Sequence, residues 1–277
     1  MDRKQRAEEL TAQVDGWLDD LTHQLQDGHS EEYMAMLDFY ADNFHKYSFA
    51  NQWLILSQNK NAVLCRGYKQ WAELGCQVRQ GEKAIWIRGP WLRKEIDPDT
   101  GEKVEKLVGY TALTVFDVSQ VDGAENLPNT IHQLKGDEDL LYAQVVAAIE
   151  RQGVVVEEKD LNWKYHGLST PGKIQIDSKL STREKLVVAF HELGHEYMHQ
   201  RDAEKRTSRQ EELEAESVSY ILARQYGIES NFSRDYLLRF KEPVEGLQQS
   251  LGRIHQAVKV LSEWLEPAEE PVALAAD

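Results

Sequence analysis

The chain has 277 residues, of which 41% are hydrophobic and 29% charged, and its formal net charge is −15. This composition excludes a fibrous or wholly disordered chain, and the acidic balance excludes a protein that coats nucleic acid with its whole surface. The N-terminus is polar, no run of 18 apolar residues occurs and only Cys65 and Cys76 are present, so we expect a cytoplasmic protein with reduced cysteines and no membrane partner.

The first 60 residues are predicted to be helical. Apolar side chains recur at steps of three and four between Ala7 and Leu25, which is typical of one buried face of a helix. Ser30 can cap a second helix and Ser48 a third, because a serine hydroxyl accepts a hydrogen bond from the free backbone N–H groups at a helix start.

A short helix and a β-hairpin are predicted next. Residues 68–74 have helical spacing, and Gly75 is suited to end that helix. Residues 83–88 and 108–116 are rich in β-forming side chains. The turn sequence Asp-Pro-Asp-Thr-Gly at 97–101 lies between them, so we expect a hairpin with a long exposed tip.

The composition changes between residues 119 and 135, where Gly, Asn, Pro and Asp predict a linker. Beyond it, strands are predicted at 154–156 and 173–177, and helices at 137–152, from 186 into the segment 191–195, at 211–226 and at 247–265, with a frayed end at 267–277. The fold class is therefore α+β, with one domain at residues 1–120 and a second at 135–277.

The segment His191-Glu192-Leu193-Gly194-His195 carries a metal-site pattern. Two histidines four apart on a helix share one face about 6 Å apart along the axis, so both imidazoles can bind one zinc ion. Glu192 points about 100° away around the helix, where it can deprotonate a water molecule without binding the metal. We therefore predict His191 and His195 as ligands and Glu192 as the general base.

A third ligand is expected from the acidic helix that follows. Glu212 and Glu216 share a face, and Ala215 offers a small surface for close packing of the two helices. Glu212 is predicted to bind the metal and Glu216 to orient a ligating histidine, although the reverse assignment stays open.

Three further side chains have weaker patterns. His199 lies about 12 Å along the helix from His191, so it cannot share an ion with both other histidines and is expected to pack or to contact a ligand. Tyr165 and His166 precede a predicted strand and are candidates to polarise a substrate carbonyl, with ordinary packing as the alternative.

Residues 59–94 are locally basic, with eight cations and two anions, a net charge of +6 in an acidic chain. Aromatic residues are interleaved with these cations, as in proteins that stack single-stranded bases on aromatic rings. The alternative is that Trp53 and Trp71, which fall on apolar helix faces, belong to the core.

These motifs together resemble the ArdC-type antirestriction proteins. The N-terminal likeness rests on Tyr-Ser-Phe-Ala-Asn at 47–51, Trp71 followed by Gly75, and the segments 78–84 and 115–120. The C-terminal likeness rests on 191–195 and on Glu-Leu-Glu-Ala-Glu at 212–216, whose spacing is also similar to the ImmA/IrrE-type metallopeptidases.

The resemblance implies a helical and β-hairpin domain that binds single-stranded DNA, followed by a zincin-like metallopeptidase domain with zinc as cofactor. It also implies antirestriction or another role in phage or mobile-element defence, with a protein substrate or a restriction component as partner. The DNA-contact candidates are Tyr47, Asn51, Trp71, Arg79, Lys83, Trp86 and Arg88.

Two alternatives stay open. The chain can be a non-catalytic interaction protein that binds single-stranded DNA and keeps the zincin fold only as a scaffold. The Trp-rich region can also be a docking surface for a protein.

Overall fold

The computed structural model describes residues 2–43, 47–96, 103–126, 137–162, 164–200, 206–239 and 246–266. The chain divides into two compact units. Unit 1 comprises Met1–Ile131 and Leu238–Gln248, and unit 2 comprises His132–Leu237 and Gln249–Asp277. The predicted hairpin tip at 97–101, Phe44 of the predicted second helix, most of the predicted linker and the frayed end at 267–277 lie outside the described residues.

Unit 1 begins with the predicted helices, which are α1 (Arg3–Gln26), α2 (Glu31–Asn43), α3 (Phe49–Gln58) and α4 (Tyr68–Glu73). The buried face of α1 consists of the apolar residues that recur in the sequence between Ala7 and Leu25. Ser48 caps α3, since its hydroxyl accepts from the Asn51 N–H. Gly75 follows α4 with a φ of 76°, a conformation that glycine adopts without strain.

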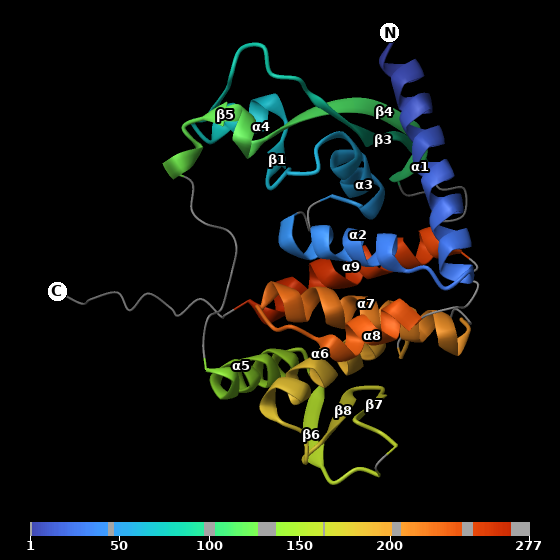
Figure 1. The fold of residues 1–277 in the computed structure, drawn as a ribbon, viewed down its shortest axis with the longest axis vertical. Helices are drawn as coiled ribbons and strands as arrows, with labels where there is room; N and C mark the ends of the chain where they lie inside the picture. Colours follow the sequence, from blue (N-terminus) through green and yellow to red (C-terminus); the bar gives the residue numbers. More distant parts are fainter. Residues whose placement is uncertain are drawn as a thin grey trace, which may run out of the picture. The chain divides into compact units, whose positions relative to one another are not determined.

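The predicted hairpin is confirmed and is longer than expected. Strand β3 (Ile85–Ile96) pairs antiparallel with β4 (Lys103–Asp117), and Figure 1 shows the two as a long curved ribbon. Strand β1 (Cys65–Arg66) joins the other edge of β4, while β2 (Gln77–Val78) pairs with β5 (Val121–Asp122). The 3₁₀ turns η1 (Val118–Gln120) and η2 (Ala124–Asn126) flank β5, and both cysteines are free and buried.

Unit 2 is built from helix α5 (Glu138–Arg151), strands β6 (Val155–Lys159), β7 (Gly167–Thr170) and β8 (Lys173–Asp177), helices α6 (Thr182–Met198) and α7 (Ser208–Gln225), and most of α8 (Asn231–Arg239) and α9 (Leu247–Leu265). The sheet order is β6-β8-β7, with β6 parallel and β7 antiparallel to β8. Strand β7 is therefore at an edge of the sheet. Neither β7 nor α8 is predicted from the sequence.

Helix α6 lies between this sheet and α7 (Figure 1). Both helices start at capping boxes: Ser181 and Glu184 bond reciprocally at α6, and Thr207 and Gln210 do so at α7. These local signals fix where the helices begin and hence which face of each meets the other. Within the described ranges, the structure has no helix long and apolar enough to cross a bilayer.

Candidate metal centre

The three predicted ligands meet where α6 crosses α7. His191 and His195 project from α6 and Glu212 from α7, and their ligand atoms all lie within 4.8 Å of one another. The two Nε2 atoms are 3.1 Å apart, and the Glu212 oxygens lie 3.6 Å from His191 Nε2 and 3.5 Å from His195 Nε2. Ligands of a tetrahedral zinc ion are separated by about 3.4 Å, so this donor set fits such an ion.

The electrostatics of the three ligands suit a cation. Burial disfavours the charged form of His191, but the carboxylates of Glu216, Glu192 and Glu212 outweigh burial and raise its pKa. A hydrogen bond from His195, together with the nearby imidazoles, lowers the pKa of Glu212 despite burial. The site thus concentrates negative charge next to two imidazoles that can ligate a metal.

The outer nitrogen of each histidine lies near a different partner. Glu216, which is buried on α7, places Oε1 3.3 Å from His191 Nδ1. His195 Nδ1 instead lies 2.9 Å from His199 Nδ1, and His199 Nε2 lies 3.1 Å from Glu214. His199 therefore contacts the outer nitrogen of a predicted ligand, and Glu214 is a member of the site that the sequence pattern does not single out.

Glu192 lies beside the three ligands in a cleft of about 480 Å³. Burial raises the pKa of its carboxyl group, although the two imidazoles act in the opposite direction. Gly167, the first residue of β7, packs against it: a Cβ at this position would lie 2.6 Å from Glu192 Oε1 and from Val188 Cγ1. The absence of a side chain at 167 therefore gives the predicted base its room.

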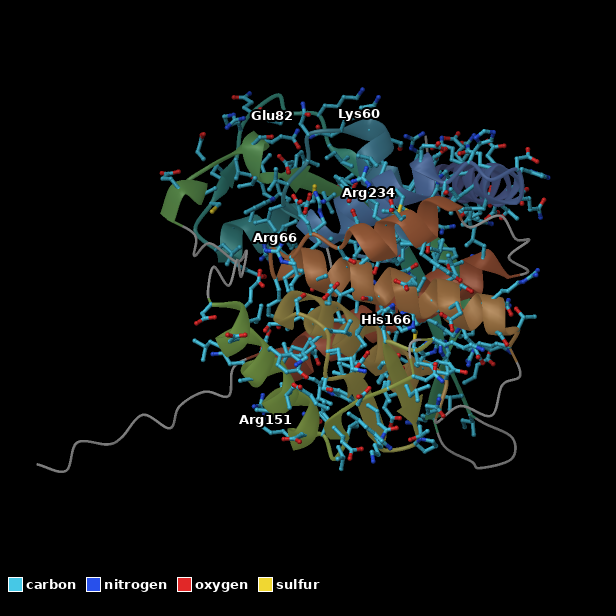
Figure 2. All side chains as sticks on the ribbon, turned by 60° about the horizontal axis from the view of Figure 1, so that its bottom comes forward. Lys60, Arg66, Glu82, Arg151, His166 and Arg234 are labelled. Carbon is cyan, nitrogen blue, oxygen red and sulfur yellow. The ribbon has the colours of Figure 1, made fainter. Side chains whose placement is uncertain are left out.

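The cleft also contains the two candidates to polarise a carbonyl, Tyr165 and His166, the second labelled in Figure 2. Tyr236 on α8 lines it as well, and burial followed by the carboxylates of Glu212 and Glu216 raises the pKa of Tyr236 to about 12. No spacing rule connects Tyr236 with the histidine motif, and only the fold brings it there.

In unit 1 the predicted DNA contacts have unequal positions. Trp71 is fully buried and donates from Nε1 to the Phe116 carbonyl. The prediction that Trp71 stacks on a base is therefore wrong, because its ring is part of the core, as its apolar helix face would suggest. Lys83 is exposed, and Trp86 is half-buried with Arg6 5.6 Å from its ring centre.

The other candidates make contacts within the protein. Asn51 joins α3 to β3, since its side chain donates to the Arg88 carbonyl at 2.8 Å and accepts from the Arg88 N–H at 2.9 Å. The Arg88 side chain is buried over the ring of Tyr110. Arg79 pairs with Glu82 and Asp122, and the half-buried Tyr47 donates to the Cys65 carbonyl. Roles for these four residues at DNA stay predictions.

Two domain families match the chain in sequence. Residues 4–116 match the N-terminal domain of anti-restriction factor ArdC, and residues 149–238 match the IrrE N-terminal-like domain of the M78 peptidases. An uncharacterised Bacillus anthracis protein, pXO2-81, is 28% identical over 92% of this chain. The chain spans about half the length of that relative, 51%.

Solved structures match along most of the chain. The metal-free crystal structure of the antirestriction protein ArdC from the R388 plasmid has a TM-score of 0.53 and 21% identity, covering 89% of this chain and 98% of that one. The Mn(II)-bound structure of the same protein has a TM-score of 0.48 and 19% identity, covering 88% and 98%. The chain thus joins a region similar to the N-terminal domain of anti-restriction factor ArdC to a region similar to the IrrE-like domain, and its fold is similar to that of ArdC from the R388 plasmid.

Proposed function

We propose that unit 2 is a metal-dependent peptidase. The observation that carries this proposal is that His191, His195 and Glu212 open into the same cleft as the buried carboxylate of Glu192. Two imidazoles and one carboxylate are a ligand set of catalytic zinc sites, and such sites keep one position open for water or substrate. The same set also suits iron(II), so the metal is part of what the experiment must determine.

A divalent ion held by these three side chains would supply a Lewis acid and lower the pKa of water. Glu192 is placed to take the proton from the attacking water and to deliver it to the departing amine nitrogen. An extended peptide can align beside edge strand β7, whose first residue packs against Glu192. Tyr165, His166 and Tyr236 line the cleft and are the candidates to donate a hydrogen bond to the carbonyl oxygen.

The test is digestion of a peptide library, read by mass spectrometry, with the full chain loaded with Zn²⁺, Mn²⁺ or Fe²⁺ or stripped by a chelator. Cleavage by the loaded wild type should fall roughly 100- to 10,000-fold in Glu192→Gln while bound metal is retained. Glu263→Gln, an exposed glutamate of α9, is the matched control and should cleave like wild type. Equal cleavage by Glu192→Gln would remove Glu192 as the base.

We also propose that unit 1 binds single-stranded DNA. In the part of the chain that the structure describes, strand β3 exposes Trp91, which is 55% accessible. The exposed cations Arg93 and Lys94 follow it on the same strand. Tyr68 is 52% exposed and faces Phe116 in a second cleft of about 490 Å³. Exposed rings among cations can stack bases and meet phosphates. Lys60 and Arg66, labelled in Figure 2, belong to the same basic segment.

Anisotropy of a labelled single-stranded oligonucleotide, measured at several salt concentrations, tests this second proposal. Trp91→Ala should weaken binding at every salt concentration, and Arg93→Ala should also reduce the salt dependence. Lys159→Ala in unit 2 serves as the control cation. If the wild type does not bind the oligonucleotide even at low salt, the aromatic surface is better explained as a docking site for protein.

The proposed setting is antirestriction or related phage and mobile-element defence in the cytoplasm, with DNA on unit 1 and a protein of the restriction or defence system as substrate of unit 2. A chain that binds DNA and metal but cleaves no peptide in the library would favour the alternative, a non-catalytic interaction protein with a structural zincin fold.

A further inference from the structure

Behind His195, a buried chain of hydrogen bonds leads away from the metal centre. His195 Nδ1 lies 2.9 Å from His199 Nδ1, and His199 Nε2 lies 3.1 Å from Glu214 Oε2. The side chains of His199 and Glu214 are 4% and 0% exposed. Neither residue lines the cleft, and the hydrogen bond of this His199–Glu214 link to a predicted ligand is made to His195.

The link has one proton arrangement that suits a metal ligand. His195 must present an unprotonated Nε2 to the metal, so its proton is on Nδ1 and is donated to His199 Nδ1. His199 then carries its own proton on Nε2 and donates it to Glu214. In the reverse arrangement His199 would donate to His195 Nδ1, and the proton of a neutral His195 ring would occupy the nitrogen that should bind the metal.

Helix α9 fixes the far end of the link. Glu214 accepts hydrogen bonds from Ser250 Oγ at 2.7 Å and from Arg253 Nε at 3.1 Å to each oxygen, and Arg253 Nη2 also contacts Oε1. Two side chains of α9 thus set the position of the Glu214 carboxylate.

We infer that α9 completes the metal centre: Ser250 and Arg253 position Glu214, Glu214 orients His199, and His199 holds His195 in the tautomer that binds metal. This inference rests on the proposed metal centre. The segment that matches the IrrE-like domain ends at residue 238, so α9 lies outside it. His191 needs no such route, because Glu216 approaches its outer nitrogen directly from α7.

A buried ion pair can also serve stability alone, so the test must separate metal affinity from folding. The measurement is the apparent Kd for Zn²⁺ of the full chain, by competition with a chromogenic chelator, together with the Tm of the metal-free protein. His199→Leu should weaken Zn²⁺ binding roughly 10- to 100-fold, as expected for the loss of a group that orients a ligand. Arg253→Met should weaken it in the same direction.

Two serines of α9 provide the matched pair. Ser250 donates to Glu214 and Ser262 donates to Gln225, so each serine joins α9 to α7 by a hydrogen bond. Only the bond of Ser250 reaches the His199–Glu214 link. Ser250→Ala should weaken Zn²⁺ binding, whereas Ser262→Ala should leave the Kd unchanged even if it lowers the Tm of the metal-free protein.

A double variant shows whether α9 acts through His199. Once His199→Leu is present, adding Arg253→Met should weaken Zn²⁺ binding no further. If the double variant loses Zn²⁺ affinity by the product of the two single-variant factors, the inference is overturned. Wild-type affinity in both single variants would overturn it as well. If Arg253→Met does not fold, the two serine variants decide, and an equal Kd for both overturns the inference.

The outcomes also separate this inference from the proposed peptidase. If the wild type binds Zn²⁺ but cleaves no peptide, the peptidase proposal fails, and the Zn²⁺ affinities of the variants still decide the role of α9. If the wild type binds none of Zn²⁺, Mn²⁺ and Fe²⁺, the metal centre and the role of α9 are both overturned.

Discussion

Gly194 of α6 lies directly against Ala215 of α7: a Cβ at position 194 would be 3.3 Å from Ala215 Cα and 3.6 Å from its Cβ. Gly194 and Ala215, the two smallest residue types, therefore meet at the crossing of the helices that carry the metal ligands. Gly194 stands one residue before His195, and Ala215 stands between Glu212 and Glu216. The close approach sets the distance between the imidazoles and the carboxylates.

Widening this crossing should weaken both stability and metal binding. Gly194→Val would force α6 and α7 apart, with an expected cost of about 1–3 kcal/mol in the free energy of unfolding, as for other overpacked cores. Urea unfolding of the metal-free protein and a Zn²⁺ competition assay measure the two effects. Gly252→Val is the control, because a Cβ there meets no atom within 4 Å and the position is exposed. Wild-type behaviour of Gly194→Val would show that the spacing is not critical.

The two glutamates on the shared face of α7 should differ in their effect on metal content. Glu216→Ala is expected to weaken Zn²⁺ binding roughly 10- to 100-fold, the usual range for a group that orients a ligand. Glu212→Ala should cost more, because it removes a ligand atom that lies 3.5 Å from His195 Nε2. Glu211→Ala is the control on the same helix. A larger loss for Glu216→Ala than for Glu212→Ala would exchange the two roles.

The contact between β7 and Glu192 predicts an effect on catalysis without loss of metal. In Gly167→Ala the new methyl group would meet Glu192 and Val188, so Glu192 must shift. We expect kcat on a cleaved peptide to fall by at least tenfold, since a misplaced base transfers protons poorly, while the Kd for Zn²⁺ stays near the wild-type value. Thr170→Ala, at the exposed end of the same strand, is the control. Unchanged kcat in Gly167→Ala would argue against Glu192 as the base.

The sequence predicts those parts of the site that depend on local spacing. The shared faces of His191 with His195 and of Glu212 with Glu216 follow from helical periodicity, and Ser48 and Gly75 mark helix ends by their own chemistry. The four-residue strand β7 has no such pattern, because Gly-Leu-Ser-Thr is too short to show alternation.

Other features depend on tertiary contacts and could not be read locally. Trp71 stands among cations in the sequence, yet its ring is buried in the core of unit 1. Glu214 points away from the ligand face of α7, as helical spacing requires, but only the fold brings Ser250 and Arg253 to it. Composition near a residue does not determine which side of the chain faces the core.

Glu214 also predicts an acid-dependent loss of stability. Its folded-state pKa of about 2 lies below the ordinary value of 4.5, so its contribution is full above pH 4.5 and is lost as the pH falls toward 2. Glu214→Gln should remove this part of the pH dependence. At neutral pH, Glu214→Gln should also lower the free energy of unfolding. Breaking a fully buried ion pair costs roughly 3–5 kcal/mol, and we expect less here because the Arg253 side chain is 24% exposed.

Urea unfolding of the metal-free protein between pH 6 and pH 3 measures the effect of Glu214→Gln, and Glu263→Gln on the exposed face of α9 is the control. The wild type and the control should lose stability as the pH falls below 4.5, and Glu214→Gln should lose less over the same interval. An equal pH dependence in all three proteins would mean that the bonds from His199, Ser250 and Arg253 do not hold Glu214 ionised.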